Sequence, residues 1–549
     1  MGPRFSPWLW LVNRQMISIA SRKTAAQRLG SLLLQVAALG VAMLSWNLVC
    51  VAQEAGANGF AAGPRSAPDQ NPLSQDERAE LLKLIRELQA RVEKLEAAQA
   101  TGRPSPQAAV PPTTPGAKHD PSSSDDPHVW MEPVVKEKPK AEASDTESYG
   151  RYSPNLGFKL ANTEYGDLSV SIYTYARYLN QRALNSTYVD AFGNTKSVQE
   201  RQDFQLQKVQ IKLLGWILNP KLRYFLYTWT SNPTQGQGAQ VVVAGNLGYT
   251  FNKYFTLAAG ITSLPGVRST EGNFPFWLGV DSRMIGDEFF RPSYTSGVWI
   301  KGNLTKRLRY QAMIGNNLST LGVSAARLDN KFNTVSTALV WTHGLGEYGQ
   351  GFGDFEDHKK ITTRLGFHFS RSDENKESQP NNDTFENTQL RLSDGTVIFT
   401  SDLFGPGITI TDARYRMVDL DAGIKFRGFS LEGEYYFRWL DNFKFLNPLT
   451  PAQLQMVPNL FDQGFQLQAS AMLLPKTLQL YGGVSRINGQ YGNPFDVRVG
   501  TNWFPWKNKV VRWNTEWLYL RNSPVGYSSV PFVVGGRGSV FHSSVELAF

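Results

Sequence analysis

The sequence predicts an all-β protein, a 16-stranded antiparallel transmembrane β-barrel preceded by a short coiled-coil helix and a disordered linker. Three observations predict this fold. The last residues alternate strictly between apolar and polar side chains. The chain is rich in aromatic residues yet has a mean hydropathy of only −0.32. Short and long connections alternate between the expected strands, as they do in outer-membrane barrels.

The C-terminal segment carries the clearest strand pattern. Phe541, Val545, Leu547 and Phe549 share one parity, interrupted only by Ser543, while the other parity is mostly polar. Alternation with a period of two indicates a strand with one apolar and one wet face. In an outer-membrane barrel, a terminal aromatic residue of this kind sits in the interfacial girdle. A soluble edge strand would show the same alternation, so the rest of the chain has to decide.

The composition restricts how the chain could cross a membrane. Beyond the N-terminal region, no apolar run reaches the roughly 20 residues that a transmembrane helix needs. In barrel strands, polar residues alternate with apolar ones and lower the mean hydropathy. A membrane protein of this composition would therefore be a barrel. The formal net charge is +9, but no basic cluster or RNA-binding motif accompanies it. We therefore expect no nucleic-acid partner, and basic residues that line a pore are the better explanation.

Residues 1–52 resemble a secretory signal peptide. Arg22, Lys23 and Arg28 precede an apolar stretch that ends at Ala52, the expected cleavage site. Met16 is an alternative start, because the segment before it is long for the basic region of a signal. The single cysteine, Cys50, would leave with the signal, so the mature chain would have no disulfide. A lipidated Cys50 and an uncleaved anchor are the alternatives.

Three segments separate the signal from the barrel. Residues 53–74 are rich in Gly, Ala and Pro and are expected to be disordered. Residues 75–100 carry apolar side chains at heptad spacing and predict a short coiled coil, with a single solvated helix as the alternative. Residues 101–148 form a Pro/Ser-rich linker. The barrel itself is expected at 149–549.

Sixteen strands can be placed in that region, an even number as in bacterial single-chain barrels. We expect them near 165–180, 203–218, 221–231, 239–250, 254–263, 294–303, 306–316, 333–343, 359–371, 415–427, 428–440, 463–474, 476–488, 495–504, 510–521 and 538–549. Connections after even strands are mostly short, and those after odd strands are long, notably 264–293, 372–414 and 441–462. The connections 344–358 and 489–494 depart mildly from this rule. Residues 390–399 are expected to form a hairpin within a loop.

Several short motifs resemble the phosphate-selective porin O and P family. They are the segments 473–476, 500–504, 426–435 and 353–358, and the likeness covers roughly residues 150–549. The resemblance implies a trimeric porin with sixteen strands in a Gram-negative-type outer membrane. The arginine ladder of the family is not mapped onto positions of this chain, so selectivity for phosphate stays open.

The third long connection, 264–293, is the expected pore constriction, because this loop folds into the lumen of many porins. Its charges nearly balance, and ordinary loop salt bridges are the alternative use for them. We expect Arg268 and Arg283 to draw anions to the narrowest point, with Asp281 and Glu288 opposing them. The expected constriction residues are Arg268, Arg283, Arg291, Asp281 and Glu288.

The pore wall follows from strand parity. On the strand 428–440, Leu431, Phe437 and Trp439 are expected to face lipid, so the residues between them face the lumen. The same test turns inward the basic residues Arg177, Lys208, Lys212, Arg223, Lys301, Arg307, Arg309, Arg364, Lys425, Arg438, Arg498 and Arg512. The inward acids are Asp419, Asp421, Glu432, Glu434, Asp496, Glu516 and Glu546. Twelve basic against seven acidic side chains predict a weakly positive lumen that favours anions.

The function expected from this pattern is a water-filled outer-membrane channel for passive diffusion of small hydrophilic solutes, with a weak preference for anions. Its expected partners are the lipid bilayer, two further copies of the chain and the solutes, and no cofactor or metal is expected. One alternative is a structural protein that tethers the envelope through its coiled coil. Another is a barrel hydrolase, for which no Ser/His motif is recognisable.

Overall fold

The computed structural model describes residues 152–153, 157–231, 240–270, 277–321, 323, 327, 331–343, 348–349, 351–379 and 390–549. The predicted signal peptide, disordered segment, coiled coil and linker lie outside the described residues. Within the described residues, no helix combines the length and apolar character needed to cross a membrane.

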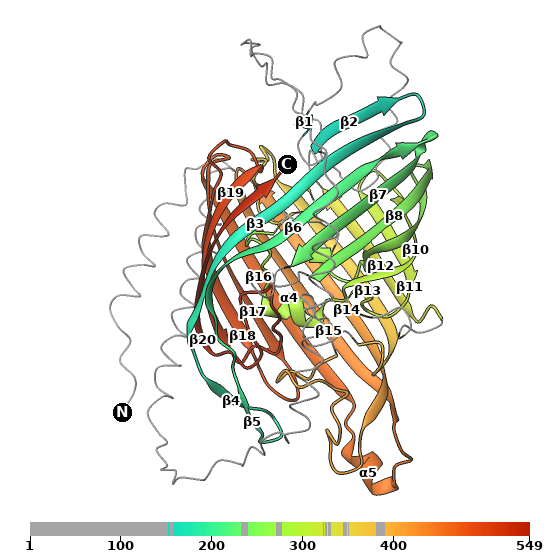
Figure 1. The fold of residues 1–549 in the computed structure, drawn as a ribbon, viewed down its shortest axis with the longest axis vertical. Coiled ribbons are helices and arrows are strands. Elements are labelled where there is room, and N and C mark those ends of the chain that lie inside the picture. The colour runs from blue at the N-terminus through green and yellow to red at the C-terminus, as the bar shows by residue number, and fades with distance from the viewer. Residues whose placement is uncertain are drawn as a thin grey trace, which may run out of the picture. The chain divides into compact units, whose positions relative to one another are not determined.

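In the described part of the chain, sixteen antiparallel strands close into a barrel (Figure 1). Each strand pairs with the next, and β20 pairs with β3 from Gly538↔Leu184 to Ala548↔Tyr173, which closes the sheet. The strands are β3 (Gly166–Leu184), β6 (Gln202–Ile217), β7 (Asn219–Ser231), β8 (Gln240–Asn252), β9 (Phe255–Ser263), β10 (Tyr294–Asn303), β11 (Leu308–Gly315), β12 (Thr334–His343), β13 (Thr362–Asn375), β14 (Ile410–Phe426), β15 (Phe429–Phe445), β16 (Leu460–Leu474), β17 (Leu478–Asn488), β18 (Phe495–Trp503), β19 (Val511–Arg521) and β20 (Gly538–Ala548).

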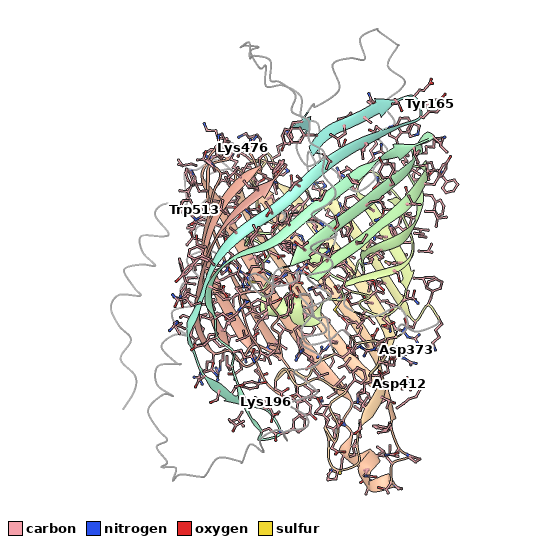
Figure 2. All side chains as sticks on the ribbon, in the orientation of Figure 1. Tyr165, Lys196, Asp373, Asp412, Lys476 and Trp513 are labelled. Atoms are coloured by element: carbon pink, nitrogen blue, oxygen red, sulfur yellow. The ribbon has the colours of Figure 1, made fainter. Side chains whose placement is uncertain are left out.

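The predicted strand count and order are confirmed, and most boundaries agree within a few residues. The main differences are at β13, β14 and β15, which run further toward the long loops than predicted. Ion pairs hold these extensions together: Arg414 Nε lies 2.7 Å from Asp373, and Lys444 Nζ lies 3.1 Å from Asp412. Figure 2 shows Asp373 and Asp412 near one end of the barrel and Lys476 at the other. Apolar alternation fades in these polar extensions, so sequence patterns end the strands too early.

Side chains alternate between the inner and outer faces of each strand, as expected from the period of two. On β15, the even positions from Ser430 to Leu440 are buried, while the odd positions are half-buried or exposed. Arg438 therefore points inward, and its neighbours Phe437 and Trp439 point outward, as predicted. The outer face is apolar on most strands, with exposed residues that include Leu257, Val298, Leu339, Leu365, Phe429 and Trp513.

Connection lengths differ between the two ends of the barrel. At the end that holds Lys476, most turns are short, and one is the two-residue turn Arg427–Gly428 between β14 and β15. Both residues of that turn have positive φ, 48° and 79°, which is the geometry of a type I′ hairpin turn. At the other end the loops are long, and one carries α5 (Pro451–Met456), whose first turn is closed by a capping box from Thr450. The predicted exceptions are confirmed, since 344–361 is long and 489–494 is short.

Two further short strands precede the barrel and were not predicted. β1 (Tyr152–Ser153) pairs with β2 (Gly157–Thr163), and β2 pairs with the first residues of β3. The ring of Phe158 on β2 lies 6.2 Å from that of Phe549. β3 is longer than β20 at this end, so β2 occupies the part of its edge that β20 leaves unpaired. A small hairpin, β4 (Thr187–Val189) with β5 (Thr195–Ser197), decorates the loop after β3.

The largest apolar cluster of the described residues lies inside the barrel and is shared between strand and loop residues. It joins Leu264, Val267 and Phe290 from one connection to Leu392 and Ile398 from another. The bridge Arg391↔Val397 shows that residues 390–399 form the predicted hairpin within a loop. Loops from the long-loop end therefore fold back and pack against the inner wall.

Candidate functional site

The connection from β9 to β10 spans residues 264–293, and we call it the inner loop. Its described residues, 264–270 and 277–293, lie within the barrel. Its two short helices, the 3₁₀ helix η3 (Arg268–Thr270) and α4 (Ile285–Phe290), are buried throughout. Figure 1 shows α4 inside the ring of strands, and its contacts are with β16, β17 and β18. The amide of Gly286 donates to Ser485 Oγ on β17 at 3.0 Å. The inner loop is thus attached to one side of the barrel wall.

Arg268 fixes the first half of the inner loop. Its Nη2 donates to Glu432 Oε1 on β15 and to the carbonyl oxygen of Gly351, both at 3.0 Å. Its guanidinium also lies over the rings of Phe352 and Tyr348, at 4.2 and 5.3 Å from their centroids. Arg268 is fully buried, so its charge is matched by a wall carboxylate instead of facing water.

Glu288 organises the second half of the loop. Arg283 Nη1 lies 2.9 Å from Glu288 Oε1, and Arg291 Nη2 lies 2.7 Å from Glu288 Oε2. The hydroxyl of Tyr527, from the loop between β19 and β20, also donates to Glu288 at 2.6 Å. Burial favours the neutral acid, but Arg291 and Arg283 outweigh it and hold the pKa of Glu288 at about 2. Glu288 is therefore an anion shared by two arginines.

Asp281 connects the inner loop to β3 and β6, beside the strand pair β20–β3 that closes the barrel. Its Oδ2 accepts a hydrogen bond from Tyr175 on β3 at 2.6 Å and lies 2.7 Å from Lys208 Nζ on β6. All five predicted constriction residues are therefore brought into the barrel, each in an ion pair. The acidic loop residues Glu288 and Asp281 were expected to oppose the basic ones, and in the structure they form ion pairs with basic side chains. Whether the loop forms the narrowest point remains a prediction.

Charge pairing also dominates the inner wall from β13 to β20. Arg364 Nε lies 2.6 Å from Asp421, Arg438 Nη2 2.6 Å from Asp462, and Arg512 Nη2 2.7 Å from Glu546. Glu434 is buried on the same face and accepts a hydrogen bond from Gln466 at 2.7 Å. The predicted inward orientation of Arg364, Arg438, Arg512, Glu432 and Glu434 agrees with their burial.

The opposite wall has a different charge pattern. The strands β7 to β12 contain no Asp or Glu at all. Their inward parity is set by buried residues such as Tyr227, Thr256 and Val340. Cross-strand pairing with these residues places Lys212 of β6, Lys301 and Arg309 on the inner face, and parity with Phe225 and Tyr227 places Arg223 there too. All four are half-buried, whereas Arg364, Arg438 and Arg512 on the other wall are buried.

One predicted wall residue lies outside the strands. Arg307 precedes β11 (Leu308–Gly315) in the exposed turn from Leu304 to Arg307, so burial does not show which way its side chain faces. Its inward orientation stays a prediction. The turn is held locally, since the amides of Arg307 and Leu308 both donate to Thr305 Oγ1.

A second inward segment was missed by the sequence reasoning. It belongs to the connection 344–361 at the short-turn end, where Tyr348 and Asp354 are buried. Lys425 Nζ donates to the carbonyl oxygens of Tyr348 and Gly351 at 2.9 and 2.7 Å, and Asp354 accepts from the amide of Gly428 at 2.8 Å. The sequence signal for this segment was the unusual length of the connection, but length alone does not indicate that a connection folds into the barrel.

Similarity to known proteins is found among solved structures. No family model matches the chain, and no curated protein matches it. Among solved structures, the chain is similar to an anion-selective porin from Comamonas acidovorans, with 9% identity over 70% of this chain and 100% of the other at a TM-score of 0.45. It is also similar to the outer-membrane channel DcaP of Acinetobacter baumannii, with 9% identity, 71% and 99% coverage, and a TM-score of 0.41. For Salmonella typhi OmpF these values are 13%, 71%, 100% and 0.41. The resemblance to the phosphate-selective porin O and P family is not confirmed.

Proposed function

We propose that the protein is an outer-membrane porin, a water-filled channel through which small hydrophilic solutes diffuse passively. The closed barrel of sixteen strands with an apolar outer face supports this proposal, because a closed barrel leaves no unpaired strand edge in lipid. A homotrimer in the outer membrane belongs to the same proposal. Selectivity for phosphate in particular is not part of it.

We further propose that the channel prefers anions, and one observation carries this. The inner face of β6 to β12 holds the half-buried basic residues Lys212, Arg223, Lys301 and Arg309, while β7 to β12 carry no carboxylate. We call the inner face of β7 to β12, together with Lys212 of β6, the acid-free face. The inner loop is attached to the opposite wall, at β15 to β18, so the solute path would run beside the acid-free face. Side chains of one sign along a low-dielectric wall raise the local concentration of the opposite ion.

The inner loop has a different role in this proposal. Arg268, Arg283 and Asp281 are buried and paired, so their charges largely cancel at a distance. We propose that the loop sets the width of the pore and that the basic residues of the acid-free face set its ion preference. This refines the expectation that Arg268 and Arg283 are the principal anion attractors.

Reversal potentials in planar bilayers under a salt gradient test the proposal. The triple variant Arg223→Gln, Lys301→Gln and Arg309→Gln should shift the reversal potential toward cations. The shift should be largest at low salt, because the Debye length is about 10 Å at 0.1 M and longer below it.

A matched control removes the same charge elsewhere. Lys306, Lys476 and Lys507 are exposed and lie in short turns, and their triple substitution by Gln should leave the reversal potential near that of the parent. Equal shifts in both variants would refute the acid-free face as the solute path. A folded parent that conducts no ions would refute the channel itself.

A further inference from the structure

His368 on β13 has a fixed protonation pattern that is unusual for a buried histidine beside acids. Its Nδ1 lies 3.0 Å from the carbonyl oxygen of Pro265 in the inner loop, and its Nε2 lies 2.9 Å from Asp421 Oδ2 on β14. A carbonyl oxygen only accepts hydrogen bonds, so Nδ1 carries a proton. Neutral His368 would then aim the lone pair of Nε2 at a carboxylate. This contact requires a positive charge between the two atoms, either a proton on Nε2 or a metal ion.

Asp419 points into the same space without a hydrogen-bond partner. Its side chain is fully buried, and neither carboxylate oxygen meets a donor among the described residues. Its Oδ2 lies 3.9 Å from His368 Nε2, beyond hydrogen-bond distance. A buried ionised carboxylate with no donor is costly, so this group calls for a cationic partner.

Carboxylates lie close together around the cluster. Arg364 is engaged by Asp421 through Nε at 2.6 Å and Nη2 at 3.0 Å. Glu434 and Asp287 lie close enough to act on Asp419 as like charges. Arg268 acts on Glu434, and Arg283 and Arg291 act on Asp287, so each of these two acids has a cation nearby. Asp419 is the acid of this group that is left without a hydrogen-bond donor among the described residues.

We propose that His368 Nε2, Asp419 and Asp421 bind one divalent first-row metal ion of the Mn²⁺ or Zn²⁺ class. One imidazole nitrogen and two carboxylates form a mixed donor set that such ions accept. The donor atoms all lie within 4.8 Å of one another. Two ligands bonded to one ion at about 2.1 Å lie at most about 4.2 Å apart, and the unrestrained carboxylate of Asp419 can turn to meet this limit.

The neighbours of the three ligands fit this role. Metal-bound histidines generally donate their other N–H to a carbonyl or carboxylate, as His368 does to Pro265. Arg364 orients Asp421 from the side and leaves lone pairs of its carboxylate for the ion. The ion would join β13 to β14 and, through His368, hold the start of the inner loop against the wall.

Metal content of the full-length folded protein tests the inference, and it does so independently of conductance. Protein without a polyhistidine tag is refolded with MnCl₂, freed of loose metal by gel filtration and analysed by mass spectrometry. The parent should retain one Mn²⁺ per chain, and Asp419→Asn should weaken binding about tenfold or more. The control Asp373→Asn changes a half-exposed acid at the far end of β13 (Figure 2) and should bind like the parent.

Two results would overturn the inference: a metal-free parent, or an Asp419→Asn variant that binds as the parent does. If Asp419→Asn does not fold, pulsed electron paramagnetic resonance of the Mn²⁺-loaded parent decides. It should show coupling to a single imidazole nitrogen, and this coupling should vanish in His368→Gln but persist in His343→Gln. A parent signal without nitrogen coupling would leave the proton on Nε2 as the bridging charge and refute the metal.

Discussion

Replacing Glu432 by glutamine should loosen the inner loop, because it removes the carboxylate that matches a buried arginine. Glu432 accepts hydrogen bonds from Arg268 Nη2 at 3.0 Å, the Tyr348 hydroxyl at 2.9 Å and the Gly353 amide at 3.3 Å. Glutamine keeps the shape of the side chain but leaves the charge of Arg268 without a carboxylate partner in this contact. Removing one member of a buried ion pair costs about 3–5 kcal/mol.

The aromatic contacts of Arg268 place this cost at the lower end of the range, because they leave the buried charge with partial partners. The rings of Phe352 and Tyr348 remain, and such cation–π contacts are worth about 0.5–2 kcal/mol. A net loss of about 3 kcal/mol would raise the population of undocked loop more than a hundredfold, since about 1.4 kcal/mol corresponds to a factor of ten. The loss falls on docking because Arg268 belongs to the loop and Glu432 to the wall.

The effect is measurable in two ways. In urea, Glu432→Gln should unfold at a lower midpoint than the parent, and in single-channel recordings it should add current fluctuations that the parent lacks. Asp441→Asn is the matched control, because Asp441 lies on the same strand and pairs with Arg416 at the surface. Exposed pairs of this kind contribute about 0–1 kcal/mol.

Two outcomes would contradict this reasoning. One is a Glu432→Gln variant as stable and as quiet as Asp441→Asn. The other concerns the double variant Arg268→Met with Glu432→Gln, which leaves no orphaned arginine and should recover part of the lost stability. If the double variant is less stable than Glu432→Gln, the buried charge is not the origin of the cost.

Three further predictions follow from the register, the turns and the buried acids. Leu431→Arg places a charge on the lipid face of β15 and should cost about 2–4 kcal/mol near the bilayer midplane, whereas Leu454→Arg on the exposed α5 should cost little in the same unfolding assay. Gly428→Ala puts a side chain on a residue with φ +79° and brings its Cβ to 2.9 Å from Met472 Cβ. The variant should therefore lose more stability than the roughly 1–2 kcal/mol that backbone strain alone costs. The control Gly193→Ala measures that strain alone, because Gly193 has φ +84° and no atom within 4 Å of the added Cβ. Burial raises the pKa of Asp287 from 3.8 to about 6. The negative charge of Glu288 adds to this rise, while Arg283 and Arg291 oppose it. Glu434 and Asp419 face Asp287 from the wall. The folded state then binds the proton more tightly, so this stabilisation is complete below about pH 4 and is lost as the pH rises through 6. Acidification from pH 7.5 to 4.5 should therefore stabilise the parent relative to Asp287→Asn in urea, and equal pH profiles would contradict the raised pKa.

The barrel is predictable from the amino-acid sequence, because the alternation that indicates it is a local pattern. The period of two decides which side chains share a face, and it placed Glu432, Glu434 and Arg438 inward without any knowledge of their neighbours. The alternation of short and long connections predicted at which end of the barrel each connection lies. Local patterns weakened where polar pairs replaced apolar alternation, which is why the predicted strands were too short at the loop ends of β13 to β15.

Which charged side chains form ion pairs depends on the folded chain. Arg268 and Glu432 are 164 residues apart, and Asp281 is 106 residues from Tyr175, so no local pattern could pair them. Their pairing depends on the path of the inner loop and on how β20 closes against β3. The pairing of β13 with β14 brings His368, Asp419 and Asp421 together, because His368 lies opposite Asp419 in the sheet. Strand parity predicts how many charged side chains face inward. Whether these charges neutralise one another depends on the distances between strands and loops, and these distances are set only when the barrel closes.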